Sequence, residues 1–157
     1  MKVLEELLAE SNTTEFHTVL FDANPLPTFV LDSEFCVIDF NAAASDFLDT
    51  SLSEVFRHRT GDLFQCRNAV ETMAECGASP ACRHCGVRNA ISEAFEGRRT
   101  TRCFHQMELM QDGERARVDL LITAAPFTDR GQRLALLILE DVTELSAPLH
   151  PSASTRS

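Results

Sequence analysis

Four cysteines fall close together in the middle of the chain, with the spacing C-x9-C-x5-C-x2-C: Cys66, Cys76, Cys82 and Cys85. Four thiols in so short a stretch suffice for one tetrahedral four-thiolate metal site or for one iron–sulfur cluster. Cys82 and Cys85 form the usual chelate pair, because two intervening residues let both sulfurs point at one ion. The spacing matches neither a zinc finger nor a ferredoxin, so it predicts a metal centre without selecting the metal.

The charge pattern sets the cysteine segment apart from the rest of the chain. The net charge is −10, yet residues 57–102 carry eight arginines against five acidic residues. Nearby arginines lower thiol pKa values and donate hydrogen bonds to sulfur. We therefore expect four side chains to surround the thiols: Arg67, Arg83, His84 and Arg88. An ordinary solvated basic patch is the alternative interpretation.

The bulk composition narrows the class of protein. A length of 157 residues with 44% hydrophobic residues fits one globular domain. No apolar run reaches the ~18 residues of a membrane span, and no signal peptide is visible, so a cytoplasmic location is expected. The acidic balance argues against nucleic-acid binding. The chain has no phosphate-binding glycine loop and no nucleophile elbow, so we expect no enzymatic activity.

Turn and cap signals divide the chain into elements. In the N-terminal part we predict a short helix with an apolar stripe at Val3–Leu8, a break at Ser11–Thr14, a second helix to Leu20 and a hairpin of Thr28–Leu31 with Phe35–Phe40. In the middle we predict a helix at Ala42–Leu48 capped by Asn41, a short helix near Val55–Phe56 and a helix ending near Gly97. The last part is predicted to form three strands, at Thr101–Met110, Ala116–Ala124 and Leu134–Leu139. This order predicts an α+β fold with a five-stranded antiparallel sheet and helices on one face.

The domain boundaries follow from the same signals. Residues 1–14 are expected to form an amphipathic helix and linker, 15–145 the folded domain, and 146–157 a disordered tail rich in Ser and Pro. The four cysteines lie in an irregular segment, residues 61–90. Val3, Leu4, Leu7 and Leu8 form a stripe too short to be stable alone in water, so we expect it to pair with a second copy of the chain. Packing onto the chain's own sheet is the alternative.

Two motifs at the ends of the domain resemble the PAS domain family. The first runs Asn24-Pro25-Leu26-Pro27-Thr28-Phe29-Val30-Leu31-Asp32 and continues with Val37-Ile38-Asp39-Phe40-Asn41-Ala42-Ala43-Ala44. The second, Leu139-Glu140-Asp141-Val142-Thr143-Glu144, is similar to the "DIT-E" end of the last PAS strand. The resemblance covers about residues 15–145 and implies a PAS fold.

The middle of the chain resembles a cysteine-bearing subset of PAS domains from bacterial sensory proteins. Gly61 precedes Cys66 by five residues, and Cys76-Gly77 leads through Cys82 and Cys85 to Ala90-Ile91, as in that subset. The resemblance implies a sensory module, commonly a homodimer, that signals to an output protein or domain such as a histidine kinase. We favour an iron–sulfur cluster, such as a 4Fe-4S cluster, that reports redox state, oxidant or gas. A zinc-stapled dimerisation module and a thiol–disulfide switch are the alternatives.

Other candidate ligands and sites are less favoured. We expect an apolar PAS pocket lined by Phe29, Phe40, Phe47, Val118, Leu120 and Leu136. His58 and His105 are conceivable haem ligands, and no flavin-adduct motif surrounds Cys66. A thiol–disulfide enzyme using Cys82 and Cys85 would need a thioredoxin-like context that is missing. Cys36 and Cys103 lie on predicted strands and are expected in the core.

Overall fold

The computed structural model describes residues 2–48, 54, 58–72 and 76–146. Its elements, in chain order, are α1 (Lys2–Ala23), β1 (Thr28–Leu31), β2 (Val37–Phe40), α2 (Ala42–Leu48), α4 (Thr60–Leu63), α5 (Arg67–Thr72), the 3-10 helix η1 (Pro80–His84), α6 (Gly86–Phe95), β3 (Thr100–Gln111), β4 (Glu114–Asp129), β5 (Gln132–Asp141) and α7 (Thr143–Ser146). The short helix expected near Val55–Phe56 and most of the tail expected at 146–157 lie outside these residues, although Ser146 ends α7.

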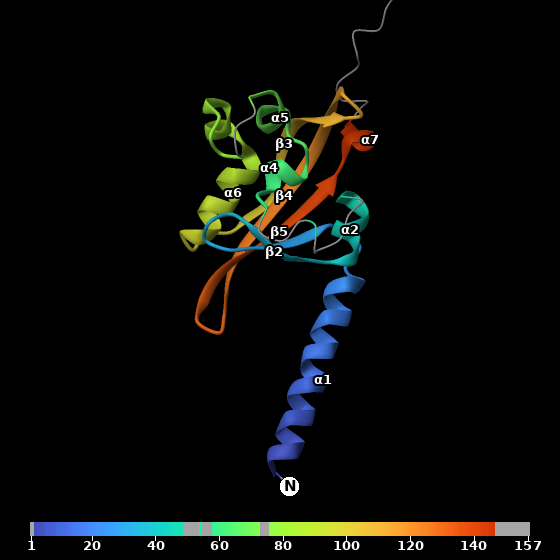
Figure 1. Cartoon of the computed structure of the whole chain (residues 1–157), viewed down its shortest axis with the longest axis vertical. Coiled ribbons are helices and arrows are strands. Elements are labelled where there is room, and N and C mark those ends of the chain that lie inside the picture. The colour runs from blue at the N-terminus through green and yellow to red at the C-terminus, as the bar shows by residue number, and fades with distance from the viewer. Residues whose placement is uncertain (1, 49–53, 55–57, 73–75, 147–157) are drawn as a thin grey trace, which may run out of the picture.

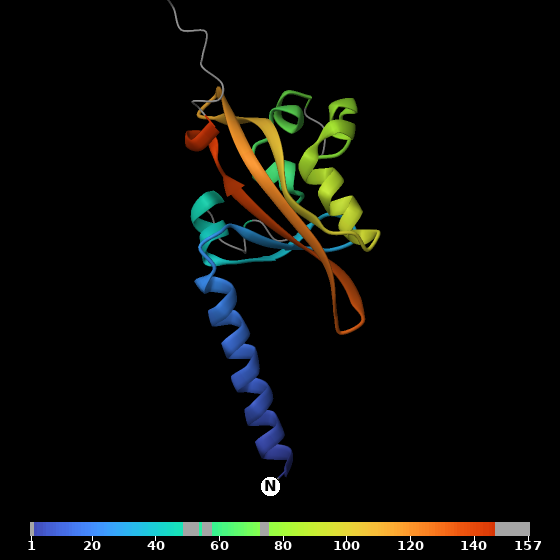
Figure 2. The ribbon, with the colours of Figure 1, turned by 180° about the vertical axis from the view of Figure 1, so that it is seen from behind.

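The five strands form one antiparallel sheet in the order β2-β1-β5-β4-β3. Strand β5 lies at its centre, as its nearly continuous apolar run predicts, and pairs with β1 and β4. Helices α4, α5 and α6 gather over one face of the sheet (Figures 1 and 2). The predicted fold class is therefore confirmed.

The core lies between α6 and the covered face of the sheet. Helix α6 turns a row of apolar residues inward at helical spacing: Val87, Ala90, Ile91 and Ala94. Alternate residues of β4 and β5 meet this row, with Ile122, Leu137 and Leu139 fully buried. This packing fixes the start of α6, which carries part of the cysteine segment, against the sheet.

Asn41 joins the first helix, the hairpin and α2. Its Oδ1 accepts hydrogen bonds from the backbone N–H of Thr28 and of Ala44, both at 3.0 Å, and the second of these is the predicted helix cap. Its Nδ2 donates to three backbone carbonyls, those of Phe21, Asn24 and Leu26. Asn41 is buried, and the two bonds to its Oδ1 atom are shielded from water.

Helix α1 differs from its prediction, because it is continuous where a break was expected at Ser11–Thr14. The hydroxyl groups of Thr13 and Thr18 donate to the carbonyls of Ala9 and Thr14, one turn earlier, so these threonines are accommodated within the helix. The helix projects away from the sheet and meets the domain at its C-terminal end (Figures 1 and 2). Its apolar side chains are therefore solvent-exposed, with Val3, Leu4 and Leu8 at 69%, 66% and 58%. None of the described helices combines the length and apolarity needed to cross a bilayer.

Candidate metal centre

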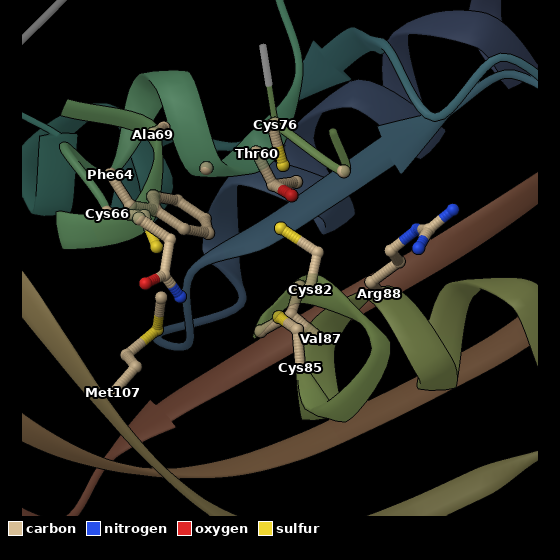
Figure 3. A pocket seen from close by; sticks show the side chains of 13 residues that line it. Thr60, Phe64, Cys66, Ala69, Cys76, Cys82, Cys85, Val87, Arg88 and Met107 are labelled. Carbon is tan, nitrogen blue, oxygen red and sulfur yellow. The ribbon is translucent and has the colours of Figure 1, made fainter. Parts of the chain in front are cut away.

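The four cysteines of the segment line one pocket on the covered face of the sheet. Its volume is about 30 Å³, and the neighbouring side chains are largely apolar: Phe64, Ala69, Val87 and Met107. In Figure 3 the sulfurs of Cys76 and Cys82 point toward one another, and Cys85 projects from the same turn as Cys82. The structure thus brings together the four thiols that the sequence singled out.

Local capping places the Cys82–Cys85 pair. Ser79 caps η1 by accepting a hydrogen bond from the backbone N–H of Ala81 at 3.3 Å, and Pro80 occupies the first turn. The backbone N–H of Cys85 then donates to the carbonyl of Cys82 at 3.2 Å. Cys85 ends this turn and is the N-cap residue of α6. The two thiols therefore sit on one rigid turn anchored to the core helix.

The first cysteine is fixed from another direction. The backbone N–H of Cys66 donates to the carbonyl of Gly61 at 2.9 Å, and Cys66 forms an isolated antiparallel bridge with Leu109 of β3. The thiol-bearing loop is thereby tied to the edge of the sheet.

Gly61 allows the second cysteine to approach. A Cβ atom at Gly61 would lie 2.6 Å from the Sγ atom of Cys76 and 3.6 Å from the Cβ atom of Cys66. The first distance is shorter than a nonbonded contact allows, so only glycine fits here without a shift of Cys76. The backbone of Cys76 is held by Arg59, whose Nη1 atom donates to the Cys76 carbonyl at 2.7 Å.

Two of the thiols are harder to ionise than a free cysteine. Burial raises the pKa of Cys76, and the nearby Asp62, Cys85 and Cys82 raise it further. A hydrogen bond from the backbone N–H of Gly61 acts in the opposite direction and lowers it. Burial also raises the pKa of Cys85, against the lowering effect of the backbone N–H groups of Arg88 and Val87. Both thiols are therefore protonated near neutral pH in the metal-free protein. A metal would have to displace these protons on binding.

The side chains expected around the thiols lie in different places. Arg67 forms ion pairs with Glu108 and Glu71. Arg83 and His84 are solvent-exposed, and Arg83 contributes a carbonyl that accepts from the side chain of Asn89. The backbone N–H of Arg88 faces Cys85, but its side chain is directed away from the sulfurs (Figure 3).

The residues expected to line an apolar PAS pocket mostly belong to the core. Phe29 and Leu120 are buried in it, and Phe40, Phe47 and Val118 pack against it. The ring of Phe64 lies 5.5 Å from that of Phe29 and 5.9 Å from that of Phe47. Leu136 lies on the other side of the sheet, in a groove beside α1 with Leu20 and Phe21. Strand alternation explains this, since its neighbours Ala135 and Leu137 point into the core.

The remaining cysteines are not in the core, contrary to expectation. Cys103 is exposed on β3, and Cys36 is half-buried just before β2. The ligand atoms of Asp32, Glu34 and Cys36 lie within 4.8 Å of one another. The Oδ1 atom of Asp32, however, accepts from the backbone N–H groups of Glu34 and Cys36 and so holds the hairpin turn. Of the two histidines considered for haem, His58 is exposed and His105 is half-buried beside Gly86.

Sequence reasoning missed Arg59, which contacts the cysteine segment. Arg59 forms an isolated bridge with Cys36, and its side chain reaches Cys76. The only signal available was its place in the basic part of the chain. The contact itself depends on the hairpin folding back over residues far away in sequence.

Comparison with known proteins identifies the fold and the family. The sequence model of the PAS domain matches residues 25–144. The structure is similar to the PAS domain of an HTR-like protein from Haloarcula marismortui, with 20% identity, 90% of this chain and 99% of that chain covered, and a TM-score of 0.53. It is also similar to the PAS domain of BvgS from Bordetella pertussis, with 20% identity, coverage of 88% and 95%, and a TM-score of 0.53.

A third solved structure is the PAS domain of nitrogen regulation protein NR(II) from Vibrio parahaemolyticus, with 14% identity, coverage of 79% and 95%, and a TM-score of 0.51. No curated protein sequence matches the chain. The chain belongs to the PAS domain family, as its two terminal motifs predict. It is accordingly a domain of the signal-sensing class.

Proposed function

We propose that this PAS domain is a non-catalytic sensor in which Cys66, Cys76, Cys82 and Cys85 bind an iron–sulfur cluster that reports redox state, oxidant or gas. The observation that carries the proposal is that all four thiols line one pocket. When bound, such a cluster supplies a redox potential that depends on its surroundings and an integrity that depends on oxidant. The chain would supply the four thiolates and a largely apolar wall.

The spread of the thiols supports a cluster over a single ion. A tetrahedral zinc with Zn–S bonds of about 2.3 Å holds its sulfurs about 3.8 Å apart. Among the described residues, one group of three potential ligands has its ligand atoms within 4.8 Å of one another, and it consists of Asp32, Glu34 and Cys36. No three of the four thiols are as close together as this. An iron–sulfur cluster is larger than one ion and needs the wider spread.

Zinc is the second candidate, and the size of the pocket favours it. A volume of about 30 Å³ has room for a particle of the size of one water or one ion. If zinc binds, its binding free energy would stabilise the folded cysteine segment, and the domain would be an interaction module with a structural zinc site. A cluster would require residues of the pocket wall to move apart.

The output would pass through the sheet to its C-terminal end. Cys66 bridges β3, β3 pairs with β4, and the backbone N–H of Asp119 on β4 donates to the hydroxyl of Thr143 at the start of α7. We propose a homodimer formed through α1 and a signalling partner such as a histidine kinase. The exposed apolar side chains of α1 support the dimer.

Anaerobic reconstitution with iron and sulfide tests this function. We expect visible absorbance that bleaches in air or peroxide, together with a change in oligomeric state or helix content. Absorbance that does not respond to oxidant would contradict redox sensing. A featureless spectrum after reconstitution would remove the cluster in favour of zinc or a thiol–disulfide switch.

A further inference from the structure

A second pocket, larger than the first, lies on the other side of Cys76. Its volume is about 420 Å³, within the usual range for small-molecule sites. The hairpin turn at Ser33–Cys36 forms one wall, the cysteine segment at Cys76–Gly77 forms another, and α6 contributes Arg88 and Ile91. Arg59 and Thr60 complete the lining, so four separate parts of the chain enclose this space.

Two arginines converge on the pocket. A Cβ atom placed on Gly77 would lie 3.5 Å from the Nε atom of Arg88 and 3.7 Å from the Nη1 atom of Arg59. Both guanidinium groups thus face the same residue of the wall. Gly77 has a φ of 94°, which a residue with a side chain rarely adopts, so the wall stays free of side-chain bulk there.

Neither arginine of this pair forms an ion pair within the described part of the chain, although Asp32 and Glu34 lie near Cys36, which Arg59 also contacts. The ion pairs found there involve Arg67, Arg98, Arg102, Arg115 and Arg117, and neither Arg59 nor Arg88 takes part in one. Arg59 donates one N–H to the carbonyl of Cys76 and also interacts with the thiol of Cys36, which fixes its position and still leaves other donors of the guanidinium group. Glu34 is the acidic residue of the lining, and its side chain is solvent-exposed.

The rest of the lining limits the kind of anion that fits. Phe35 and Ile91 supply apolar surface, and the ring of Phe35 is held by stacking on Phe95 at 5.8 Å. Guanidinium groups pair with carboxylates in a planar, two-pronged geometry. A polyphosphate would bring more negative charge toward Glu34 than two arginines offset. The chemistry of the site therefore suits one carboxylate on a small, partly apolar body.

We propose that the pocket between the hairpin turn and α6 binds a small organic carboxylate through Arg59 and Arg88. Thr60, Cys76, Gly77 and Arg88 also line the cysteine pocket, so a bound anion would contact the shared wall. An effect of the anion on the cysteine centre rests on the proposed function, whereas anion binding itself does not.

The test is a titration of the full chain with two monocarboxylates, benzoate and butyrate, and with inorganic phosphate, in which binding is monitored by amide chemical shifts. We expect both carboxylates to bind with a dissociation constant of roughly millimolar or tighter, shifting the amides of Ser33–Cys36 and Gly77, and phosphate to bind at least about tenfold more weakly. Arg88→Gln should weaken carboxylate binding at least about tenfold, because a charge-assisted hydrogen bond contributes a factor of that order. Arg130→Gln, an exposed arginine on the turn after β4, should leave binding unchanged.

Three results would overturn the assignment: no saturable shift with either carboxylate, equal weakening by Arg88→Gln and Arg130→Gln, or phosphate binding as tightly as the carboxylates. Arg59→Gln serves as a second variant, since it removes the other guanidinium. Cys85→Ser separates this proposal from the metal centre. It should retain carboxylate binding even if it loses metal, and loss of carboxylate binding in a folded Cys85→Ser protein would count against an independent site.

Discussion

The cysteine thiols start from a protonated state that a metal must overcome. Burial raises the pKa of Cys76 and of Cys85, and the neighbouring thiols oppose ionisation further. Each metal bound therefore releases protons, and metal affinity should rise with pH. The apolar wall provided by Phe64, Val87 and Met107 favours this coupling, because it keeps water from stabilising isolated thiolates.

Removing one thiol tests whether the four act together. Cys85→Ser should reduce the metal content to below about a tenth of the wild-type value and loosen residues 61–90, because a structural metal contributes folding energy to its segment. The sheet should survive, since its core is built from other residues. Elemental analysis and hydrogen exchange measure both effects. Cys103→Ser is the control, because Cys103 is exposed on β3, and equal metal loss in both variants would refute a shared centre.

Gly61 offers a test that leaves every thiol in place. Gly61→Ala should lower metal occupancy and destabilise the domain by about 1–3 kcal/mol, because the new Cβ atom would stand 2.6 Å from the sulfur of Cys76. Chemical unfolding and metal analysis measure the two effects. In a Cys76→Ala background the same change should cost less, since the sulfur is gone. An equal cost in both backgrounds would show that the contact is not responsible.

At the residue scale, the sequence could predict that the four cysteines lie around one pocket, but not which side chains surround them. The close spacing of the cysteines forces a shared neighbourhood, and Ser79-Pro80 marks the turn that carries two of them. The position of an arginine side chain depends on partners supplied by the fold. Arg67 forms an ion pair with Glu108 on β3, and the two are brought together by the bridge between the neighbouring residues Cys66 and Leu109, which joins parts of the chain far apart in sequence.

At the scale of elements, the start of α6 depends on its contact with β3. The backbone N–H of Gly86 donates to the Nε2 atom of His105 at 3.4 Å, which requires that nitrogen to be unprotonated. A Cβ atom on Gly86 would lie 2.7 Å from the ring. Burial lowers the pKa of His105 below its usual 6.5, so the folded state takes up this proton less readily than the unfolded chain.

This contact predicts a pH dependence of stability. The contribution of His105 is fully present above pH 6.5 and is lost as the pH falls below 6.5 toward the folded-state pKa. Metal-free wild-type protein should therefore lose more unfolding free energy between pH 7.5 and pH 5 than His105→Gln does, measured in urea. His17→Gln, on the exposed face of α1, should behave as wild type. Identical pH profiles for wild type and His105→Gln would contradict this role.

Two element-scale expectations failed for physical reasons that local patterns do not reveal. The polar stretch Ser11–Thr14 predicts a break in the helix. In the structure the hydroxyl of Thr13 donates a hydrogen bond to the carbonyl of Ala9 in the preceding turn, and the helix continues. The apolar run of β5 does not show which residues face the core. The pairing of β5 with β1 and β4 decides this, and it turns Leu136 toward α1. The caps, the turns and the central place of β5 could otherwise be predicted, because cap and turn residues and a continuous apolar run are local signals.

At the scale of the whole molecule, the projecting helix α1 exposes apolar side chains to solvent, and the proposed homodimer would bury them. Leu4 and Leu8 are 66% and 58% exposed, and the intrachain packing considered as the alternative is not formed at this end of the helix. Leu4→Glu combined with Leu8→Glu should shift a homodimer to monomer in sedimentation while metal content stays unchanged. Leu145→Glu, equally apolar and exposed on α7, is the control. A double variant that stays dimeric at micromolar concentration would place the interface elsewhere.

The most direct test of a four-thiolate sensor is the metal content of the full chain isolated without oxygen. We expect iron and inorganic sulfide bound to the wild-type protein, together with visible absorbance that bleaches in air. The Cys85→Ser protein should lose the bound iron and sulfide and the absorbance. One zinc per chain would retain the four-thiolate centre but contradict redox sensing through a cluster. Protein that contains neither iron nor zinc, from cells supplied with both metals, would contradict the account as a whole.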